Sequence, residues 1–176
     1  MELSLVVDAA RFGDQRGHST VRAGSAPRPR VGTLTTMPSV FTKIIDGELP
    51  GRFVWRDNHC AAFLSIAPLR AGHTLVVPRE EVDHWIELDP AVMGHLTKVA
   101  QTIGKALEAA FSPAKVGLMI AGLEVPHVHL HVVPIDGVHD LDFGNADHDP
   151  DPADLDAAAE AVRVALRKLG AADVAD

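Results

Sequence analysis

The chain contains only one cysteine, Cys60, among its 176 residues. A single cysteine excludes an internal disulfide framework and a Cys-x-x-Cys zinc site. Because Cys60 lies in an alternating, strand-like run, we expect a small buried hydrophobic residue rather than a reactive thiol. The chain also lacks an apolar run near the ~18 residues that a membrane-spanning helix needs, and its N-terminus lacks the apolar stretch of a secretory signal. These absences lead us to expect a cytoplasmic protein without a membrane partner.

Basic residues are also scarce. The net charge is −8, and residues 1–36 hold five arginines against three acidic residues, a balance of +2 that leaves −10 for the remainder. A long nucleic acid binds through many Lys and Arg contacts, so an acidic body of this kind disfavours it as a partner. A small nucleotide in one local pocket remains compatible, because nearby groups decide its binding.

Common motifs for phosphate binding and hydrolysis are missing. No G-x-x-x-x-G-K-[ST] or G-x-G-x-x-G pattern occurs, so a phosphate site of the P-loop or Rossmann kind is excluded. No G-x-S-x-G pattern occurs, which disfavours a serine hydrolase. Any nucleotide chemistry must therefore use another arrangement of residues.

What the chain does have is a row of three histidines. The stretch Val125–Pro134 reads V-P-H-V-H-L-H-V-V-P, so His127, His129 and His131 alternate with aliphatic residues. Successive side chains of a β-strand point to opposite faces, so this spacing predicts three imidazoles on one face and a core-facing aliphatic stripe on the other. Three neighbouring imidazoles are costly on one face, because a charge on one disfavours a charge on the next. A strand that only had to be half buried would carry Thr, Lys or Glu on its outer face instead. The row therefore indicates a functional site.

Two chemistries could use such a row. A metal ion could take two or three neutral imidazoles from one face. Alternatively, one imidazole could act as a nucleophile while its neighbours orient it and hold an anion. The spacing of the histidines leaves both open.

The apolar periodicity predicts an α+β domain in which five strands in hairpin-like order form an antiparallel sheet against one long helix. The long helix starts after Asp89, with Pro90 at its first position, and ends at Ser112. A short N-terminal helix is capped by Ser39. The expected helices are 40–45 and 90–111, and the expected strands are 52–55, 59–66, 73–77, 116–121 and the histidine row.

Three parts follow from these patterns. For residues 1–36 we predict a disordered arm, because residues 11–30 are mostly Gly, Arg, Ser and Pro without a period. Residues 37–135 form the domain, and residues 136–176 form an acidic loop and a C-terminal helix that begins after Asp151 and ends at Gly170. We expect this helix to pack on the domain or across a dimer through Leu155, Val162, Leu166 and Leu169.

Three blocks in order resemble a known family. His-Val-His-Leu-His-Val-Val resembles the histidine-triad motif, in which three histidines each precede an apolar residue. Ala71–Pro78 (AGHTLVVP) resembles the family's second block, and Phe41–Pro50 (FTKIIDGELP) resembles its opening helix and turn. The chain is therefore similar, over roughly residues 39–134, to the general bacterial branch of the histidine-triad (HIT) nucleotide-binding family.

The resemblance implies roles for the histidines. The family's middle histidine attacks the α-phosphorus and carries the nucleotidyl group, which makes His129 the expected nucleophile. His127 and His131 are then expected to orient it and to bind phosphate, and His73 is a candidate for orienting the triad from behind. The other histidines are expected outside the site: His84 and His95 on exposed faces, His18, His139 and His148 in loops, with His59 left open.

The loop before the triad is the expected phosphate site. Gly122 fits the family's turn, where a missing side chain lets backbone N–H groups approach a phosphate, and Leu123 and Glu124 follow it. The loop departs from the family in lacking the usual Asn and Gln. Glu124 also stands where a small hydroxyl residue is common, and its carboxylate would repel a phosphate.

The expected nucleoside pocket contains a second departure. Ser65 stands where the family usually carries an acid for the ribose hydroxyls, so ribose recognition should be weaker or different. Ile66 and Phe41 are candidates for lining the base, although core packing would explain them equally well.

The sequence thus predicts a nucleotide-binding hydrolase or transferase. It would act at the α-phosphate of a nucleoside phosphoramidate or nucleotide conjugate through a nucleotidyl-histidine intermediate, without metal or another cofactor. The alternatives are a nucleotide-binding protein of the same fold without turnover, and a metal-dependent hydrolase that uses the histidine row as ligands. The expected partners are a purine nucleoside monophosphate or its conjugate and a second copy of the chain in a C2 homodimer.

Overall fold

The computed structural model describes residues 37–176, and the expected arm at residues 1–36 lies outside the described residues. The helices are α1 (Val40–Ile45), α2 (Pro90–Phe111) and α3 (Pro152–Lys168), with short 3₁₀ helices η1 (Trp85–Glu87), η2 (Val138–Leu141) and η3 (Phe143–Asn145). The strands are β1 (Phe53–Arg56), β2 (Cys60–Leu64), β3 (Thr74–Pro78), β4 (Lys115–Met119) and β5 (Leu130–Ile135). Within residues 37–176, no helix is both long and apolar enough to cross a membrane.

All five strands belong to one antiparallel sheet in the order β1-β2-β3-β5-β4. The α+β class and the five-stranded sheet are therefore confirmed. β5 pairs on both sides, and its His131 lies opposite Leu75 of β3 and Met119 of β4. An inner strand is held by two ladders of hydrogen bonds, so it gives the side chain of His131 a rigid base.

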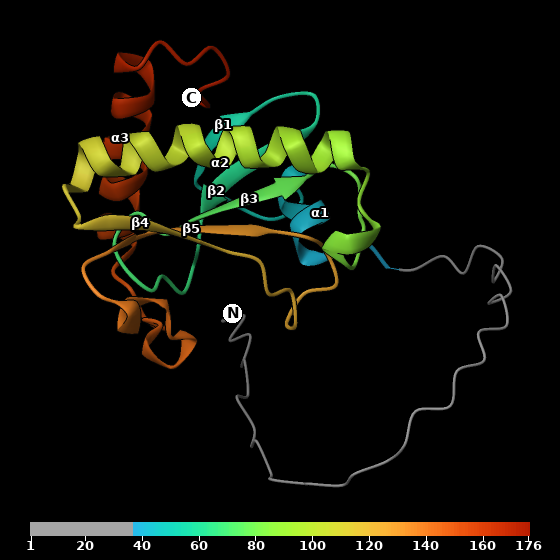
Figure 1. The fold of residues 1–176 in the computed structure, drawn as a ribbon, viewed down its shortest axis with the longest axis horizontal. Helices are drawn as coiled ribbons and strands as arrows, with labels where there is room; N and C mark the ends of the chain where they lie inside the picture. The colour runs from blue at the N-terminus through green and yellow to red at the C-terminus, as the bar shows by residue number, and fades with distance from the viewer. Residues whose placement is uncertain (1–36) are drawn as a thin grey trace, which may run out of the picture. The chain divides into compact units, whose positions relative to one another are not determined.

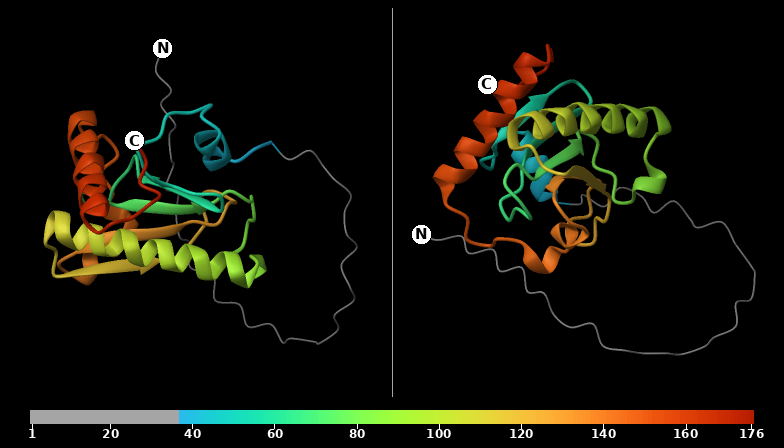
Figure 2. Two further views of the ribbon diagram at one scale, coloured as in Figure 1. Left: turned by 90° about the horizontal axis from the view of Figure 1, so that it is seen from above. Right: turned by 60° about the vertical axis from the view of Figure 1, so that its left-hand side comes forward.

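The helices α2 and α3 pack on one face of the sheet (Figures 1 and 2). Because strand side chains alternate, one set of residues from each strand faces these helices and the other set faces away. The cluster on this face includes Val54, Ala62, Val76, Leu130 and Val132 from the sheet and Leu96, Ile103, Leu107, Val162 and Leu166 from the helices. The predicted aliphatic stripe between the histidines is thus part of the main core.

The opposite face carries α1 and a smaller apolar cluster. Phe41 and Ile45 of α1 pack there with Phe63, Leu75 and other residues of the sheet. His131 is paired with Leu75 and points to the same side, so the imidazoles and α1 share this face. The short N-terminal helix is consequently a wall of the candidate site.

Side-chain caps place the helix starts. Ser39 Oγ accepts the N–H of Thr42 at 3.1 Å, Asp89 Oδ1 accepts that of Ala91 at 2.7 Å, and Asp151 Oδ1 accepts that of Ala153 at 2.8 Å. Each cap satisfies a backbone donor that the first helical turn leaves without a partner. All three predicted caps are confirmed, and Pro follows the cap in α2 and α3.

Some predicted bounds are wrong. β5 begins at Leu130 rather than running through all three histidines, because the N–H groups of His127 and Val128 bond to Val125 and Val82 outside the sheet. β4 begins and ends before its predicted bounds. Leu169, expected on the apolar face of α3, follows the end of the helix and is half exposed.

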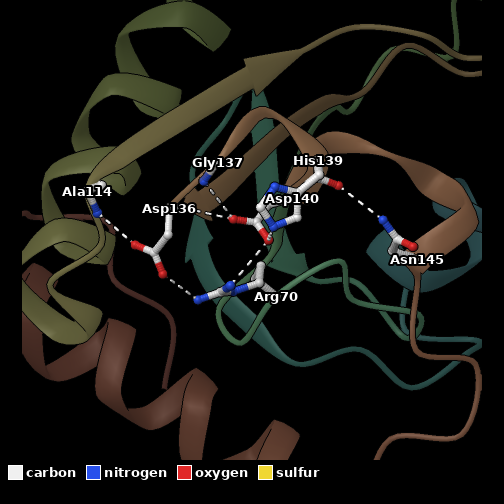
Figure 3. A network of polar contacts seen from close by, with 7 residues as sticks. All are labelled: Arg70, Ala114, Asp136, Gly137, His139, Asp140 and Asn145. Atoms are coloured by element: carbon white, nitrogen blue, oxygen red, sulfur yellow. Dashed lines mark hydrogen bonds and ion pairs between the residues drawn. The ribbon is translucent and has the colours of Figure 1, made fainter.

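The segment after β5 has more structure than the predicted acidic loop. It contains η2 and η3, and a polar network ties it to the loop before β3 (Figure 3). Arg70 donates to Asp136 Oδ2 at 2.8 Å and to Asp140 Oδ1 at 3.2 Å. Asp140 Oδ2 in turn accepts the backbone N–H groups of Asp136 and Gly137. These contacts fix the path by which the chain returns over the histidine face.

Candidate active site

The three histidines of the row are buried, with exposed fractions of 0% for His127, 4% for His129 and 6% for His131. His129 Nδ1 lies 2.8 Å from the backbone oxygen of His127. A carbonyl oxygen only accepts, so Nδ1 carries the proton and the lone pair of a neutral His129 lies on Nε2. The ring of Phe41 meets that of His129 edge-on, with centroids 4.8 Å apart, and holds its orientation.

Both ring nitrogens of His127 are used by the protein. Nε2 donates to the backbone oxygen of Pro78 at 2.9 Å, so Nδ1 is the acceptor and receives the hydroxyl of Ser39 at 2.7 Å. His127 therefore has no free nitrogen for a phosphate oxygen. Its contribution to the row is the backbone carbonyl that fixes the tautomer of His129.

A small network from α1 holds His127 in place. Glu81 Oε2 accepts the backbone N–H of Ser39 at 2.9 Å and the hydroxyl of Thr42 at 2.6 Å. The bonds from Thr42 and Ser39 lower the pKa of the Glu81 carboxyl. Ser39 thus caps α1 and donates to His127, whose carbonyl accepts from His129, so hydrogen bonds connect the first helix to His129.

His131 is oriented by a second chain of contacts. The backbone N–H of Leu69 donates to His73 Nδ1 at 3.1 Å, so the proton of a neutral His73 lies on Nε2. His73 Nε2 lies 3.0 Å from His131 Nδ1 and donates to it. The proton of a neutral His131 is consequently on Nε2, the nitrogen that remains for the pocket.

Burial keeps these imidazoles neutral. Desolvation, with a smaller contribution from His129, lowers the pKa of His73 to about 4. Desolvation and the neighbouring His129 and His73 lower the pKa of His131 to about 3. Burial also lowers the pKa of His127 and of His129 below the usual value. The row is therefore uncharged near pH 7, and His129 presents a lone pair next to an N–H group of His131.

A small pocket of about 60 Å³, partly open to solvent, lies against the two free imidazole edges. It is lined by His129, His131, the loop 121–124 and Phe143. Phe143, from η3, meets the ring of His131 edge-on with centroids 5.0 Å apart. The segment that the Arg70 network anchors therefore supplies one wall of the pocket.

The three residues expected at the phosphate do line this pocket. Gly122 has φ of +72°, a left-handed conformation that favours glycine. Leu123 is 93% exposed and Glu124 is also exposed at the rim. The Glu124 carboxylate is close enough to raise the pKa of His129 against the effect of burial, which is larger.

Of the three residues expected at the nucleoside, Phe41 packs against the histidine rings, whereas Ser65 and Ile66 follow β2 and do not line this pocket. The Ser65 hydroxyl donates to the backbone oxygen of Ala67 at 3.0 Å and accepts the N–H of the same residue at 3.2 Å. Ile66 is 74% exposed, and neither residue lines the pocket. Phe41 is buried and serves as packing for the histidine rings.

Sequence reasoning missed Glu81, Phe143 and the contact of Ser39 with His127. A helix cap was a visible signal for Ser39, but nothing in the pattern pairs it with a residue 88 positions later. Glu81 follows β3 in a polar stretch, and Phe143 lies in an acidic segment without periodicity. Only the folded chain brings these residues to the histidine row.

A second group could in principle hold a metal. Ligating atoms of Asp57, Cys60 and His95 lie within 4.8 Å of one another. Asp57 Oδ2, however, accepts from Trp55 Nε1 at 2.7 Å and from His95 Nε2 at 2.8 Å. Burial opposes ionisation of Asp57, but the bonds from Trp55, His59 and Cys60 hold its pKa well below the usual range, and burial raises the pKa of the Cys60 thiol. The hydrogen bonds of Asp57 with Trp55, Cys60 and His95 explain this group without a metal ion.

This group instead anchors the turn between β1 and β2 to α2. Cys60 is buried, as predicted, whereas His95 is half buried rather than exposed. His59 is exposed, and its ring lies 5.0 Å from that of His95. These histidines therefore have a structural explanation that is separate from the triad.

Comparison with known proteins agrees with this arrangement. The model of the HIT domain family matches residues 46–138. An uncharacterised HIT-like protein of Methanocaldococcus jannaschii is 36% identical over 99 residues, which cover 54% of this chain and 77% of that protein. The Bacillus subtilis protein hit is 31% identical over 100 residues, covering 54% of this chain and 69% of that protein.

Solved structures show the same similarity. A zinc-bound histidine triad family protein from Mycobacterium smegmatis superimposes with a TM-score of 0.66 at 28% identity, covering 76% of this chain and 96% of that one. A hypothetical histidine triad nucleotide-binding protein from Sulfolobus tokodaii gives 0.65 at 26% identity, with 73% and 92% covered. With the family model spanning more than half of the sequence and the triad on an antiparallel sheet, the chain belongs to the HIT domain family.

Proposed function

We propose that the protein is a nucleotide hydrolase or transferase that acts at the α-phosphorus of a nucleoside phosphoramidate or related conjugate through a covalent His129 intermediate. The observation that carries the proposal is the pair of assigned tautomers. His129 presents an Nε2 lone pair to the pocket, and His131 presents an Nε2–H group beside it. A nucleophile next to a donor for a phosphoryl oxygen is the arrangement that phosphoryl substitution requires.

The reaction has two steps. In the first, His129 Nε2 attacks the α-phosphorus, the P–N bond to the amine breaks, and the amine leaves with the electron pair and takes up one proton from solvent. In the second, a water molecule attacks the phosphorus, gives one proton to solvent, and releases His129 with its lone pair restored. The two steps together consume one water molecule and yield a nucleoside monophosphate and an amine.

Each neighbouring residue has a part in this scheme. The carbonyl of His127 accepts the Nδ1 proton of His129 and stabilises the positive charge that develops on the ring as the new bond forms. The N–H of His131 would donate to a non-bridging phosphoryl oxygen, and the backbone at Gly122 would do the same. Burial favours the neutral form of His129, so the nucleophile is available near pH 7.

The nucleotide partner is supported by similarity. The Sulfolobus tokodaii structure is described as a histidine triad nucleotide-binding protein. A purine nucleoside monophosphate remains our candidate for the bound moiety, with its phosphate at Gly122, Leu123 and His131. Ser65 and Ile66 do not line this pocket, and their contacts with the nucleoside stay predictions.

The alternative hypothesis is a metal-dependent hydrolase, and one observation in its favour is that the similar protein from Mycobacterium smegmatis is zinc-bound. In this chain a metal at the triad would need lone pairs on His129 and His131 together. The Leu69 N–H fixes His73, and His73 fixes His131 with its proton on Nε2, so His131 offers no lone pair to the pocket. The hydrogen-bond chain therefore favours covalent catalysis over metal ligation.

The test is turnover of an adenosine phosphoramidate with a fluorescent amine leaving group. We expect the full chain to hydrolyse it, and His129→Ala to lose at least about 10³-fold in kcat, because the nucleophile is gone. Thermal shift with AMP should show binding by both proteins. EDTA treatment should leave the rate unchanged.

Three results would separate the readings. Retained activity in His129→Ala would rule out a nucleophilic role for His129. Loss of activity in EDTA with recovery in zinc would support metal-dependent hydrolysis instead. AMP binding without turnover of any phosphoramidate would identify a binding protein of this fold.

A further inference from the structure

The pocket beside the triad has an unusual charge. Of the described residues that line it, none is Lys or Arg, and Glu124 carries the one formal charge at neutral pH, because both lining histidines are kept neutral by burial. Arg70, which anchors the Phe143 wall, is already paired with Asp136 and Asp140 (Figure 3). A leaving group that occupies this pocket would therefore meet a carboxylate and no available cation from the lining.

This charge has a consequence for substrate choice. A phosphoanhydride substrate releases a polyphosphate chain, whose negative charge must be balanced as it leaves. Sites for such groups place Lys, Arg or a metal ion around the phosphates. In this pocket the departing polyphosphate would meet the Glu124 carboxylate, and like charges across a partly desolvated pocket repel.

An amine leaving group fits the same surroundings. It departs neutral and becomes an ammonium ion at pH 7, which a carboxylate accepts through a charge-assisted hydrogen bond. Phe143 forms an apolar wall against His131, where the carbon chain of an amine could pack. Glu124 is exposed at the rim, so its side chain can reach a group that enters the pocket.

From these observations, and on the basis of the function proposed above, we infer that Glu124 is a specificity-determining residue that selects the leaving group by charge. It favours amines, above all those with a second ammonium group, and disfavours anionic leaving groups, including polyphosphates. The Glu124 carboxylate thus discriminates among nucleotide conjugates by the charge of their leaving groups.

The experiment uses three adenosine phosphoramidates that differ only at the far end of the leaving amine. The amines are 1,5-diaminopentane, pentylamine and 5-aminopentanoate, which end in an ammonium, a methyl and a carboxylate group. The kcat/KM of the full chain should fall in that order, with at least a tenfold difference between the first and the last. Diadenosine tetraphosphate, as a polyphosphate conjugate, should be at least as poor as the aminopentanoate derivative.

Variants of the carboxylate give the decisive comparison. Glu124→Gln should reduce the ratio between the cationic and anionic substrates to within about threefold, and Glu124→Lys should reverse it. Glu108→Gln, which removes an equal charge from an exposed position on α2, is the matched control and should keep the wild-type ratio. Glu124 is exposed at the rim, so these variants should fold with unchanged melting temperatures.

The inference is overturned if wild-type protein turns over the three amines at equal rates, or if Glu124→Gln keeps the wild-type ratio. Either result leaves the proposed phosphoramidase function in place. If wild-type protein turns over none of the substrates, the proposed function itself fails and the inference fails with it.

Discussion

The two ends of the histidine row differ in how their nitrogens are used. His127 is the closed end of the row, because it is fully buried and both of its ring nitrogens are hydrogen-bonded within the protein. Its Nε2 donates to the backbone oxygen of Pro78, and its Nδ1 accepts from the Ser39 hydroxyl. His131 is the open end, because its Nδ1 accepts from His73 while its Nε2 faces the pocket. His129 lies between them, with its Nδ1 on the carbonyl of His127.

The difference shows that three equivalent residues in the sequence have three distinct roles. At the closed end, the carbonyl of His127 sets the tautomer of His129. The open end has the free N–H group that a substrate can contact. Changes at the open end should therefore alter rate, whereas changes at the closed end should alter stability.

The largest effect is expected at the open end. His131→Asn removes the N–H that faces the pocket, while its amide oxygen can still accept from His73. We expect kcat to fall on the order of 10²-fold, the usual cost of one donor to a developing phosphoryl charge, with little change in KM. Steady-state kinetics with an adenosine phosphoramidate measures this. A variant within threefold of wild type would show that His131 does not contact the reacting group.

A moderate effect is expected at the closed end. Ser39→Ala removes the cap of α1 and the donor to His127 Nδ1. The Thr42 hydroxyl, 3.5 Å from Nδ1, already donates to Glu81 at 2.6 Å, so the buried acceptor is left poorly satisfied. The free energy of unfolding should fall by about 2–4 kcal/mol in urea titrations, from a lost cap of about 1 and an unsatisfied buried acceptor of about 1–3. We expect kcat to stay within about threefold, because the carbonyl of His127 belongs to the backbone.

Asp151→Ala is the matched control, since it removes only a cap, that of α3. It should cost about 1 kcal/mol, as caps usually do. If Ser39→Ala costs no more than this control, the bond between Ser39 and His127 contributes nothing to the fold.

A smaller effect concerns acid. Burial lowers the pKa of His73 to about 4 and that of His131 to about 3, whereas an unfolded histidine titrates near 6.5. Between pH 6.5 and 4 the unfolded chain thus binds more protons than the folded one, so the free energy of unfolding falls as the pH is lowered. Urea titrations at several pH values should show this slope, and His131→Asn should reduce it. Equal slopes in both proteins would mean that His131 is not buried in its neutral form.

Local chemistry made much of the fold predictable. Ser39, Asp89 and Asp151 cap the helices at the expected residues, because capping depends on side chains within one turn. The strand ends were less predictable. β5 starts at Leu130 because Val128 bonds to Val82, a tertiary contact that periodicity does not contain.

The candidate site was also predictable only in part, because its local pattern is visible in the sequence and its long-range contacts are not. Alternation placed the three histidines and family resemblance ranked His129, but the separate uses of His127 and His131 depend on Ser39, Pro78 and His73 in the folded chain. Phe143 reaches the pocket through η3, which follows the last residue that the family model matches. Long-range contacts of this kind have no signal in a single sequence.

Other expectations stay predictions. The C2 homodimer, expected to pair through the long helix at residues 89–111 and a sheet edge, is one of these, and light scattering would test it. The disordered arm and the cytoplasmic location are likewise untested.

The central claim, that His129 carries the nucleotidyl group, is tested most directly by the stereochemical course at phosphorus. A single diastereomer of an adenosine phosphorothioate amide is hydrolysed in ¹⁸O water, and the configuration of the product is determined by phosphorus NMR. Each in-line displacement inverts the configuration, so attack by His129 followed by attack by water predicts overall retention. Overall inversion would show that water attacks the substrate directly, and it would contradict the covalent histidine mechanism.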